Sequence, residues 1–211
     1  MKKLLPLLVL CAFVAVGCST SYMTSSTNVS NEKKAYNKIL VVAKTKNKTA
    51  RIRFEDQVVA DLAALGVSAA SSLDVIKVES FDKQLTEKDL DKLRSDLVAS
   101  GYDGILVTNL IDASQYTDVV PGGTSTAYYP ARYGRFGRYY GYYPVTYWEP
   151  DQVRTGVQYI LESTLYDMTD NDGDDLQWVG QFKLKDPGSI NKTVEKYSKE
   201  LTTALKESSI Q

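Results

Sequence analysis

The residue types that most often carry acid–base, nucleophilic or zinc chemistry, histidine and cysteine, are nearly absent from this chain of 211 residues. It contains no histidine, and its two cysteines are Cys11 and Cys18. Histidine and cysteine supply most general bases, activated nucleophiles and zinc ligands in proteins. An enzyme built on this sequence would have to use carboxylates, lysine or tyrosine alone. We therefore expect no catalytic residues and no metal site.

Cys18 lies in a context that favours covalent modification. Lys2 and Lys3 precede an apolar run over residues 4–16, and Ala15-Val16-Gly17 stands directly before Cys18. A basic segment, an apolar segment of about 7–15 residues and small residues at the cut define a secretory signal peptide. The residues before Cys18 resemble the lipobox of bacterial lipoprotein precursors, with alanine where leucine is usual. An ordinary secretory signal or a short membrane anchor is the alternative, although a spanning helix needs about 20 apolar residues.

Lipoprotein processing would remove residues 1–17, with Cys11, and leave acylated Cys18 as the first residue. The mature chain would then have no free thiol for disulfides, nucleophiles or metal sites within one protomer. The covalent lipid on Cys18 is the only non-protein group that we expect. Ser19 in place of aspartate resembles the sorting signal for the outer membrane, with the domain facing the periplasm. Residues 18–37 are polar without periodicity and predict a flexible tether.

The segment from Val119 to Trp148 combines aromatic, arginine and glycine residues in a pattern that favours binding. It separates two predicted strands where about five residues would suffice. Tyrosine and arginine are enriched at binding hot spots, while tyrosine and tryptophan also suit membrane interfaces and stacking on sugars. The candidate partner-binding residues are Tyr128, Tyr129, Arg132, Tyr133, Arg135, Phe136, Arg138, Tyr139, Tyr140, Tyr142, Tyr143, Tyr147 and Trp148.

This segment also has structural interpretations. It could be a long hairpin whose strands pack the rings against each other, or a loop of low complexity. Interleaved arginine and tyrosine can bind single-stranded nucleic acid. We expect no nucleic-acid partner, because the chain carries a net charge of −1 at pH 7 and the predicted compartment is the periplasm.

The acidic run Asp170-Asn171-Asp172-Gly173-Asp174-Asp175 suggests calcium binding. With Gly173 at the sixth position of an EF-hand loop, the first and twelfth positions would be Met168 and Val179, which carry no carboxylate. A solvated hairpin loop rich in turn-forming residues is the better interpretation.

The elements that position these residues predict an α/β fold. Apolar runs rich in β-branched residues predict buried strands, and apolar residues at helical spacing predict the helices between them. The predicted order is a strand over 38–43, a helix over 52–65 ended by Gly66, a short strand within 67–76, a helix from the capping box of Thr86 and Asp89 to Gly101, and a strand within 102–112. This βαβαβ order implies parallel strands covered by helices.

The second half predicts a long antiparallel hairpin and a last helix. Residues 157–166 and 176–184 alternate apolar and polar side chains as two strands would. Asp186-Pro187-Gly188-Ser189 then breaks the chain and caps a helix from Ile190 to Leu205. We expect one mixed sheet with helices packed on it, in a single domain over 38–211 with the aromatic insertion at about 119–150.

Three motifs resemble those of known periplasmic proteins. They are Gly101-Tyr102-Asp103-Gly104-Ile105-Leu106-Val107, the Tyr-rich segment 128–148, and Leu165-Tyr166-Asp167 followed by Trp178 and Gly180. The chain is similar to bacterial outer-membrane lipoproteins of unknown function that share these motifs. Its order of elements also resembles the amino-terminal domain of TolB and the penicillin-binding-protein activator lipoprotein B. The resemblance supplies no catalytic residues. Asp103, near the start of the predicted central strand, is compatible with a site residue and equally with a residue of a turn at the end of the strand.

These observations favour a non-enzymatic outer-membrane lipoprotein that binds an envelope protein or peptidoglycan through the Tyr-rich segment. A self-associating scaffold that contacts peptidoglycan is the first alternative. A hydrolase of cell-wall glycan that uses paired carboxylates is the second, although no such pair stands out from the surface charge.

Overall fold

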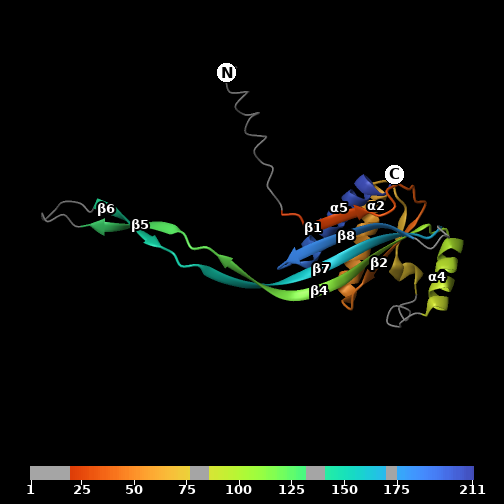
Figure 1. Ribbon diagram of the computed structural model, residues 1–211, viewed down its shortest axis with the longest axis horizontal. Coiled ribbons are helices and arrows are strands. Elements are labelled where there is room, and N and C mark those ends of the chain that lie inside the picture. Colours follow the sequence, from red (N-terminus) through yellow and green to blue (C-terminus); the bar gives the residue numbers. More distant parts are fainter. Residues whose placement is uncertain (1–19, 77–85, 132–140, 170–174) are drawn as a thin grey trace, which may run out of the picture.

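The chain folds into a body from which a long arm projects (Figure 1). The computed structural model describes residues 20–76, 86–131, 141–169 and 175–211. The body is a six-stranded mixed sheet in the order β1-β8-β7-β4-β2-β3, with helices on its faces, which confirms the predicted α/β class. Its strands are β1 Met23–Asn28, β2 Ile39–Lys44, β3 Ala69–Ser71, β4 Gly104–Val120, β7 Gln152–Asp167 and β8 Leu176–Lys185. A separate pair holds β5 Thr124–Ala131 and β6 Gly141–Trp148, and the helices are α2 Lys48–Ala64, α3 Ser72–Val75, α4 Glu87–Ala99 and α5 Ile190–Ser208.

The first half forms the predicted βαβαβ unit, in which β2 pairs in parallel with β3 and β4. β2 is apolar without alternation because both of its faces are buried. Its odd-numbered residues from 39 to 43 join the cluster under α2 and α5, and Leu40 and Val42 join the cluster under α4. Gly66 follows α2 with a φ of 81°, a conformation that glycine adopts without steric cost. The predicted capping box of Thr86 and Asp89 begins α4.

The second half forms the predicted hairpin and last helix. β7 and β8 pair antiparallel, and Ser189 caps α5 through a hydrogen bond from the Lys192 N–H to its hydroxyl. α5 packs beside α2 on one face of the sheet, where Leu201 and Leu205 are fully buried. The Tyr197 ring of α5 lies 4.1 Å from the Phe182 ring of β8, centroid to centroid. The main core therefore lies between the sheet and these two helices.

The prediction of a flexible tether over residues 18–37 is wrong for the part that the structure describes. Residues 23–28 form β1, which pairs antiparallel with β8 at the edge of the sheet. Its four central side chains are exposed serines and threonines, so the strand has no apolar alternation to reveal it. Backbone hydrogen bonds to β8 hold it instead, and such pairing leaves no trace in side-chain hydrophobicity. Residues 18 and 19 lie outside the described residues.

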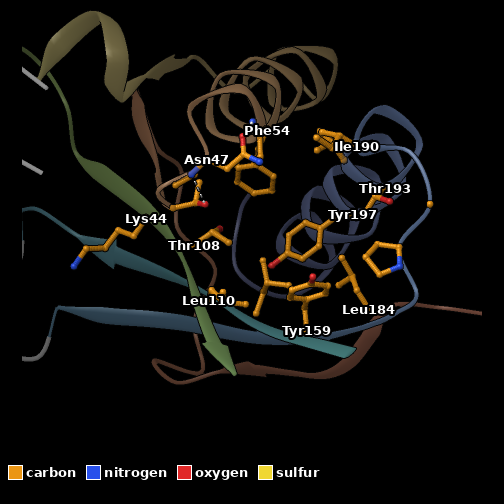
Figure 2. Close-up of a pocket in the computed structure, with 17 residues that line it drawn as sticks. Lys44, Asn47, Phe54, Thr108, Leu110, Tyr159, Leu184, Ile190, Thr193 and Tyr197 are labelled. Carbon is orange, nitrogen blue, oxygen red and sulfur yellow. Dashed lines mark hydrogen bonds between the residues drawn. The ribbon is translucent and has the colours of Figure 1, made fainter. Parts of the chain in front are cut away.

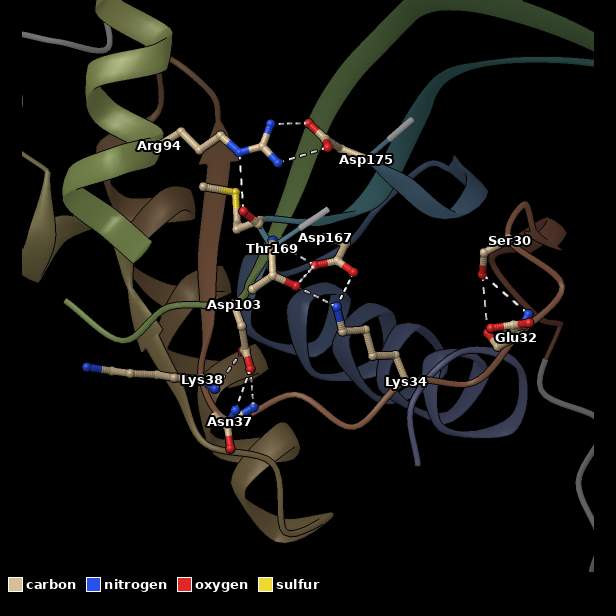
Figure 3. A network of polar contacts seen from close by, with 11 residues as sticks. Ser30, Glu32, Lys34, Asn37, Lys38, Arg94, Asp103, Asp167, Thr169 and Asp175 are labelled. Carbon is tan, nitrogen blue, oxygen red and sulfur yellow. Dashed lines mark hydrogen bonds and ion pairs between the residues drawn. The ribbon is translucent and has the colours of Figure 1, made fainter. Parts of the chain in front are cut away.

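Polar contacts fix residues 34–38, which lie between β1 and β2 (Figure 3). Lys34 forms an ion pair with Asp167 at the end of β7. Burial acts to raise the pKa of Asp167, but hydrogen bonds, led by that from Lys34, outweigh it and hold the pKa below its usual value. Asp103 accepts hydrogen bonds from the backbone N–H groups of Asn37 at 2.7 Å and Lys38 at 2.9 Å. Asp103 therefore fastens this segment to the start of β4, which is a structural role.

Candidate interaction surface

β4 and β7 are longer than predicted and leave the body together as a two-stranded ribbon (Figure 1). The pairing of β2 with β4 ends at Asn109, and the pairing of β8 with β7 ends at Gln158. Beyond these points β4 and β7 pair only with each other, out to Val120 and Gln152, in the part of the chain that the structure describes. We call residues 111–120 and 152–157 the ribbon. An isolated two-stranded ribbon is only marginally stable in water, which indicates that this element gains stability by contact.

The two faces of the ribbon differ in charge. A bulge between Leu110 and Asp112 shifts the register of β4. Beyond this bulge, the odd-numbered residues of both β4 and β7 lie on the face that continues toward α2 and α5. This inner face contains no charged residue and consists of Ala113, Gln115, Thr117, Val119, Val153, Thr155 and Val157. Val119 and Val153, an opposed pair, are 58% and 67% exposed. The outer face carries all the charges of the ribbon, which are Asp112, Asp118 and Arg154.

The predicted binding segment is the far end of the arm, which we define as the ribbon together with the β5–β6 hairpin. β5 and β6 pair antiparallel, with Thr124 opposite Trp148 and Tyr128 opposite Pro144. Tyr128 and Trp148 therefore share a face of the hairpin, and they are 68% and 71% exposed. Tyr147, on the other face, is 47% exposed.

The remaining candidates are placed only in part. Tyr129, Tyr142 and Tyr143 lie within the hairpin strands. Seven candidates and the lipid-attachment residue lie outside the described residues; they are Arg132, Tyr133, Arg135, Phe136, Arg138, Tyr139, Tyr140 and Cys18. The rings of Tyr128 and Trp148 are largely exposed, so these two do not take part in the aromatic packing that the structural alternative requires.

A clasp that sequence reasoning missed fixes the ribbon where it leaves the body. The Tyr116 hydroxyl donates a hydrogen bond to the Asp186 carboxylate, which also accepts from the Val157 N–H at 2.8 Å. Lys185 lies 4.5 Å from the Tyr116 ring centroid. The hydrogen bond from Tyr116 lowers the pKa of Asp186 and raises that of Tyr116. Gly156 leaves the space that this contact occupies, since a Cβ there would lie 2.4 Å from the Asp186 carboxylate.

Replacing Gly156 by alanine is therefore expected to break the clasp. The pKa of Asp186 should rise toward its usual 3.8, and the Val157 amide should lose protection against hydrogen exchange. Because the native pKa is lowered, the clasp should be complete above that usual value and weaken as pH falls through the lowered pKa. An NMR titration of the Asp186 carboxylate measures its pKa, and hydrogen exchange followed by NMR measures the protection of the Val157 amide. Gly188→Ala is the matched control, because a Cβ at Gly188 meets nothing within 4 Å. An unchanged Asp186 pKa in Gly156→Ala would contradict the role of the clasp.

An apolar groove of about 360 Å³ opens beside the root of the ribbon (Figure 2). It lies between the sheet and the first turns of α2 and α5, and its walls include Phe54, Leu110, Tyr159, Leu184 and Ile190. Hydroxyl groups of three residues line up beneath it, with 2.6 Å between Thr108 and Ser163 and 3.0 Å between Ser163 and Tyr197. Burial raises the pKa of Tyr197, so its hydroxyl stays neutral. This groove offers apolar contact and no charged catalytic pair.

A metal site is the next possibility to consider. The described residues include no group of three or more His, Cys, Asp or Glu side chains placed to hold a metal ion. Most of the acidic run over 170–175 lies outside them, and its last residue, Asp175, accepts hydrogen bonds from the Arg94 guanidinium at 2.7 and 2.9 Å. In the same ranges, no helix is both long and apolar enough to cross a membrane.

Comparisons with known proteins give only distant likenesses. No protein-family model matches the chain, and no curated protein matches it. A PelC dodecamer structure from Paraburkholderia phytofirmans is 9% identical with a TM-score of 0.43, covering 86% of this chain and 94% of that one. Lipoprotein GNA1162 from Neisseria meningitidis is 12% identical with a TM-score of 0.40, covering 83% and 100%. These identities and TM-scores are too low to support a statement about family or function.

Proposed function

We propose that the protein is a lipid-anchored, non-enzymatic module of the bacterial outer membrane whose arm is its contact surface. The observation that carries the proposal is the tip of the arm, where Tyr128 and Trp148 share one face of the hairpin and are 68% and 71% exposed. The exposed valines Val119, Val153 and Val157 lie on one uncharged face of the ribbon, and an exposed apolar face of this kind can mark a contact site. The signal sequence and Cys18 support the anchor, and the lipid is the only non-protein group in the proposal.

The described part of the arm presents residues suited to binding. Its described tip presents Tyr128 and Trp148 on one face, and such rings provide large contact area with few rotatable bonds. An envelope protein or peptidoglycan in the periplasm is the proposed partner class. In this role the lipid fixes the position of the body and the arm sets the reach of the contact.

Self-association into a scaffold is the second candidate function. The specific observation in its favour is the open backbone edge of each ribbon strand, since open edges pair with strands of other chains. The hairpin is less suited to this pairing because Pro144 in β6 lacks the N–H that a sheet requires. Among the described residues, strand pairing is therefore more favourable along the ribbon than along β6, and the tip favours side-chain contacts.

Removal of the hairpin tests the proposed function. Val120 and Gln152 are directly opposed, so an Asn-Gly turn can replace residues 121–151 without changing the register of the ribbon. Crosslinking in the intact envelope followed by mass spectrometry is expected to identify one dominant heterologous partner for the native chain and to lose it for this variant. Circular dichroism should show an unchanged body. Crosslinks between copies alone would support the scaffold, and a partner retained by the variant would contradict binding through the tip.

A further inference from the structure

The first described residues leave the sheet at the same end as the arm. Met23 of β1 pairs with Phe182, Phe182 pairs with Leu161, and Leu161 pairs with Leu110. These four residues form one row across four strands, immediately beyond the last pairing of β2 with β4 at Asn109. The chain preceding Met23 therefore emerges at the row from which the ribbon departs.

Contacts with α5 hold this emerging segment in place. The Glu200 carboxylate accepts hydrogen bonds from the Tyr22 N–H at 2.8 Å and the Met23 N–H at 3.0 Å. Lys196 lies 4.2 Å from the Tyr22 ring centroid and donates a hydrogen bond to the Thr20 carbonyl. Thr20 is therefore fixed on the body, and it stands only two positions after Cys18.

This attachment leaves little distance between lipid and body. Two residues reach at most about 7 Å when fully extended, whereas a tether of the length predicted from the sequence would have lifted the body clear of the membrane. From Leu110 to Ala131 the arm is long enough to extend about 70 Å at the rise of a strand. An arm of that length, starting at the anchored end, cannot stand upright between the body and the bilayer, so the character of its two faces decides whether it lies along the surface or points away from it.

The two faces of the ribbon suit a position along the surface. A peripheral element buries an uncharged face in the boundary between headgroups and acyl chains and keeps its charges in water. The inner face has no charged residue and continues into the apolar groove at Leu110 and Tyr159, while Asp112, Asp118 and Arg154 lie on the outer face. We infer that the end of the body bearing the ribbon faces the membrane and that the inner face of the ribbon lies in its lipid headgroup region.

The inference rests on the proposed lipid anchor and names the bilayer as the first component that the arm contacts. A single-cysteine pair tests it. Processing removes Cys11 and acylates Cys18, so a newly introduced cysteine is the only free thiol of the mature chain. Val119→Cys places a thiol on the inner face, and Val120→Cys, the matched control, places it one residue later on the outer face.

Each lipidated mature variant is labelled with an environment-sensitive fluorophore and reconstituted in vesicles of phosphatidylethanolamine and phosphatidylglycerol. Lipids with a quencher in the upper acyl chain are expected to quench the label at position 119 roughly threefold more than at 120, because surface elements insert about 5–10 Å. Flotation and mass analysis of the same samples confirm that the anchor is present and acylated.

The outcomes separate the two proposals. Vesicles that float with acylated protein but quench the two labels equally would overturn the membrane-facing ribbon and leave the anchor intact. A label at 119 that is shielded from water but not quenched by lipid, with crosslinks between copies, would replace the bilayer by a second copy. Protein that lacks acylation at Cys18 and does not float would overturn both the anchor and the inference built on it.

Discussion

Replacing Glu55 by glutamine is expected to lower the free energy of unfolding by about 3–5 kcal/mol, as breaking a buried ion pair does. Glu55 is fully buried in α2 and accepts hydrogen bonds from the Arg51 Nε at 3.0 Å and the Ala43 N–H at 2.9 Å. The hydroxyls of Ser71 and Ser72 donate to the same carboxylate. Glutamine would remove the negative charge opposite Arg51, which is only 7% exposed, and would present an N–H group to donors.

Thermal and urea unfolding followed by circular dichroism measure this effect. A loss of that size corresponds to a fall in melting temperature on the order of 10 °C for a domain of this length. Asp56→Asn is the matched control, because Asp56 is the next residue on α2 and is exposed; it should change stability by less than about 0.5 kcal/mol. A cost below about 1 kcal/mol for Glu55→Gln would show that Arg51 is compensated without Glu55.

The order of elements could be predicted because the buried strands and helices carry strong local signals. β2 is apolar on both faces, α4 begins at a capping box, and Gly66 follows the end of α2. β1 escaped prediction because an edge strand of exposed serine and threonine is held through its backbone. The greater length of β4 and β7 escaped it because the polar residues of the ribbon resemble those of a loop.

Composition indicates which segment holds the candidate residues but not their geometry. The aromatic content of the segment singled out Tyr128, Tyr147 and Trp148, which the structure leaves exposed; their role in binding stays a prediction. The clasp of Tyr116 with Asp186 joins residues 70 positions apart, and no local pattern announces such a contact. The uncharged inner face was hidden by the bulge after Leu110, which changes which residues share a face.

The Trp178 and Gly180 motif, which supported the resemblance to known lipoproteins, has a packing explanation. Trp178 is fully buried on β8, and its indole N–H donates to the Ser26 hydroxyl of β1 at 3.0 Å. Residues two apart on a strand lie on the same face, so the tryptophan ring extends over Gly180. A Cβ at Gly180 would lie 2.1 Å from the ring atom Cη2. Glycine is therefore required wherever this ring conformation is kept.

Gly180→Ala is accordingly expected to destabilise the protein by about 3 kcal/mol, near the upper part of the usual range for an overpacked core. Trp178→Ala should cost about 3–5 kcal/mol through the cavity it leaves. Because the cost at Gly180 arises from the ring, adding Gly180→Ala to Trp178→Ala should cost less than about 1 kcal/mol. Urea unfolding of the two single variants and the double variant measures this coupling. Additive costs would show that the glycine is needed for its backbone and not for the tryptophan.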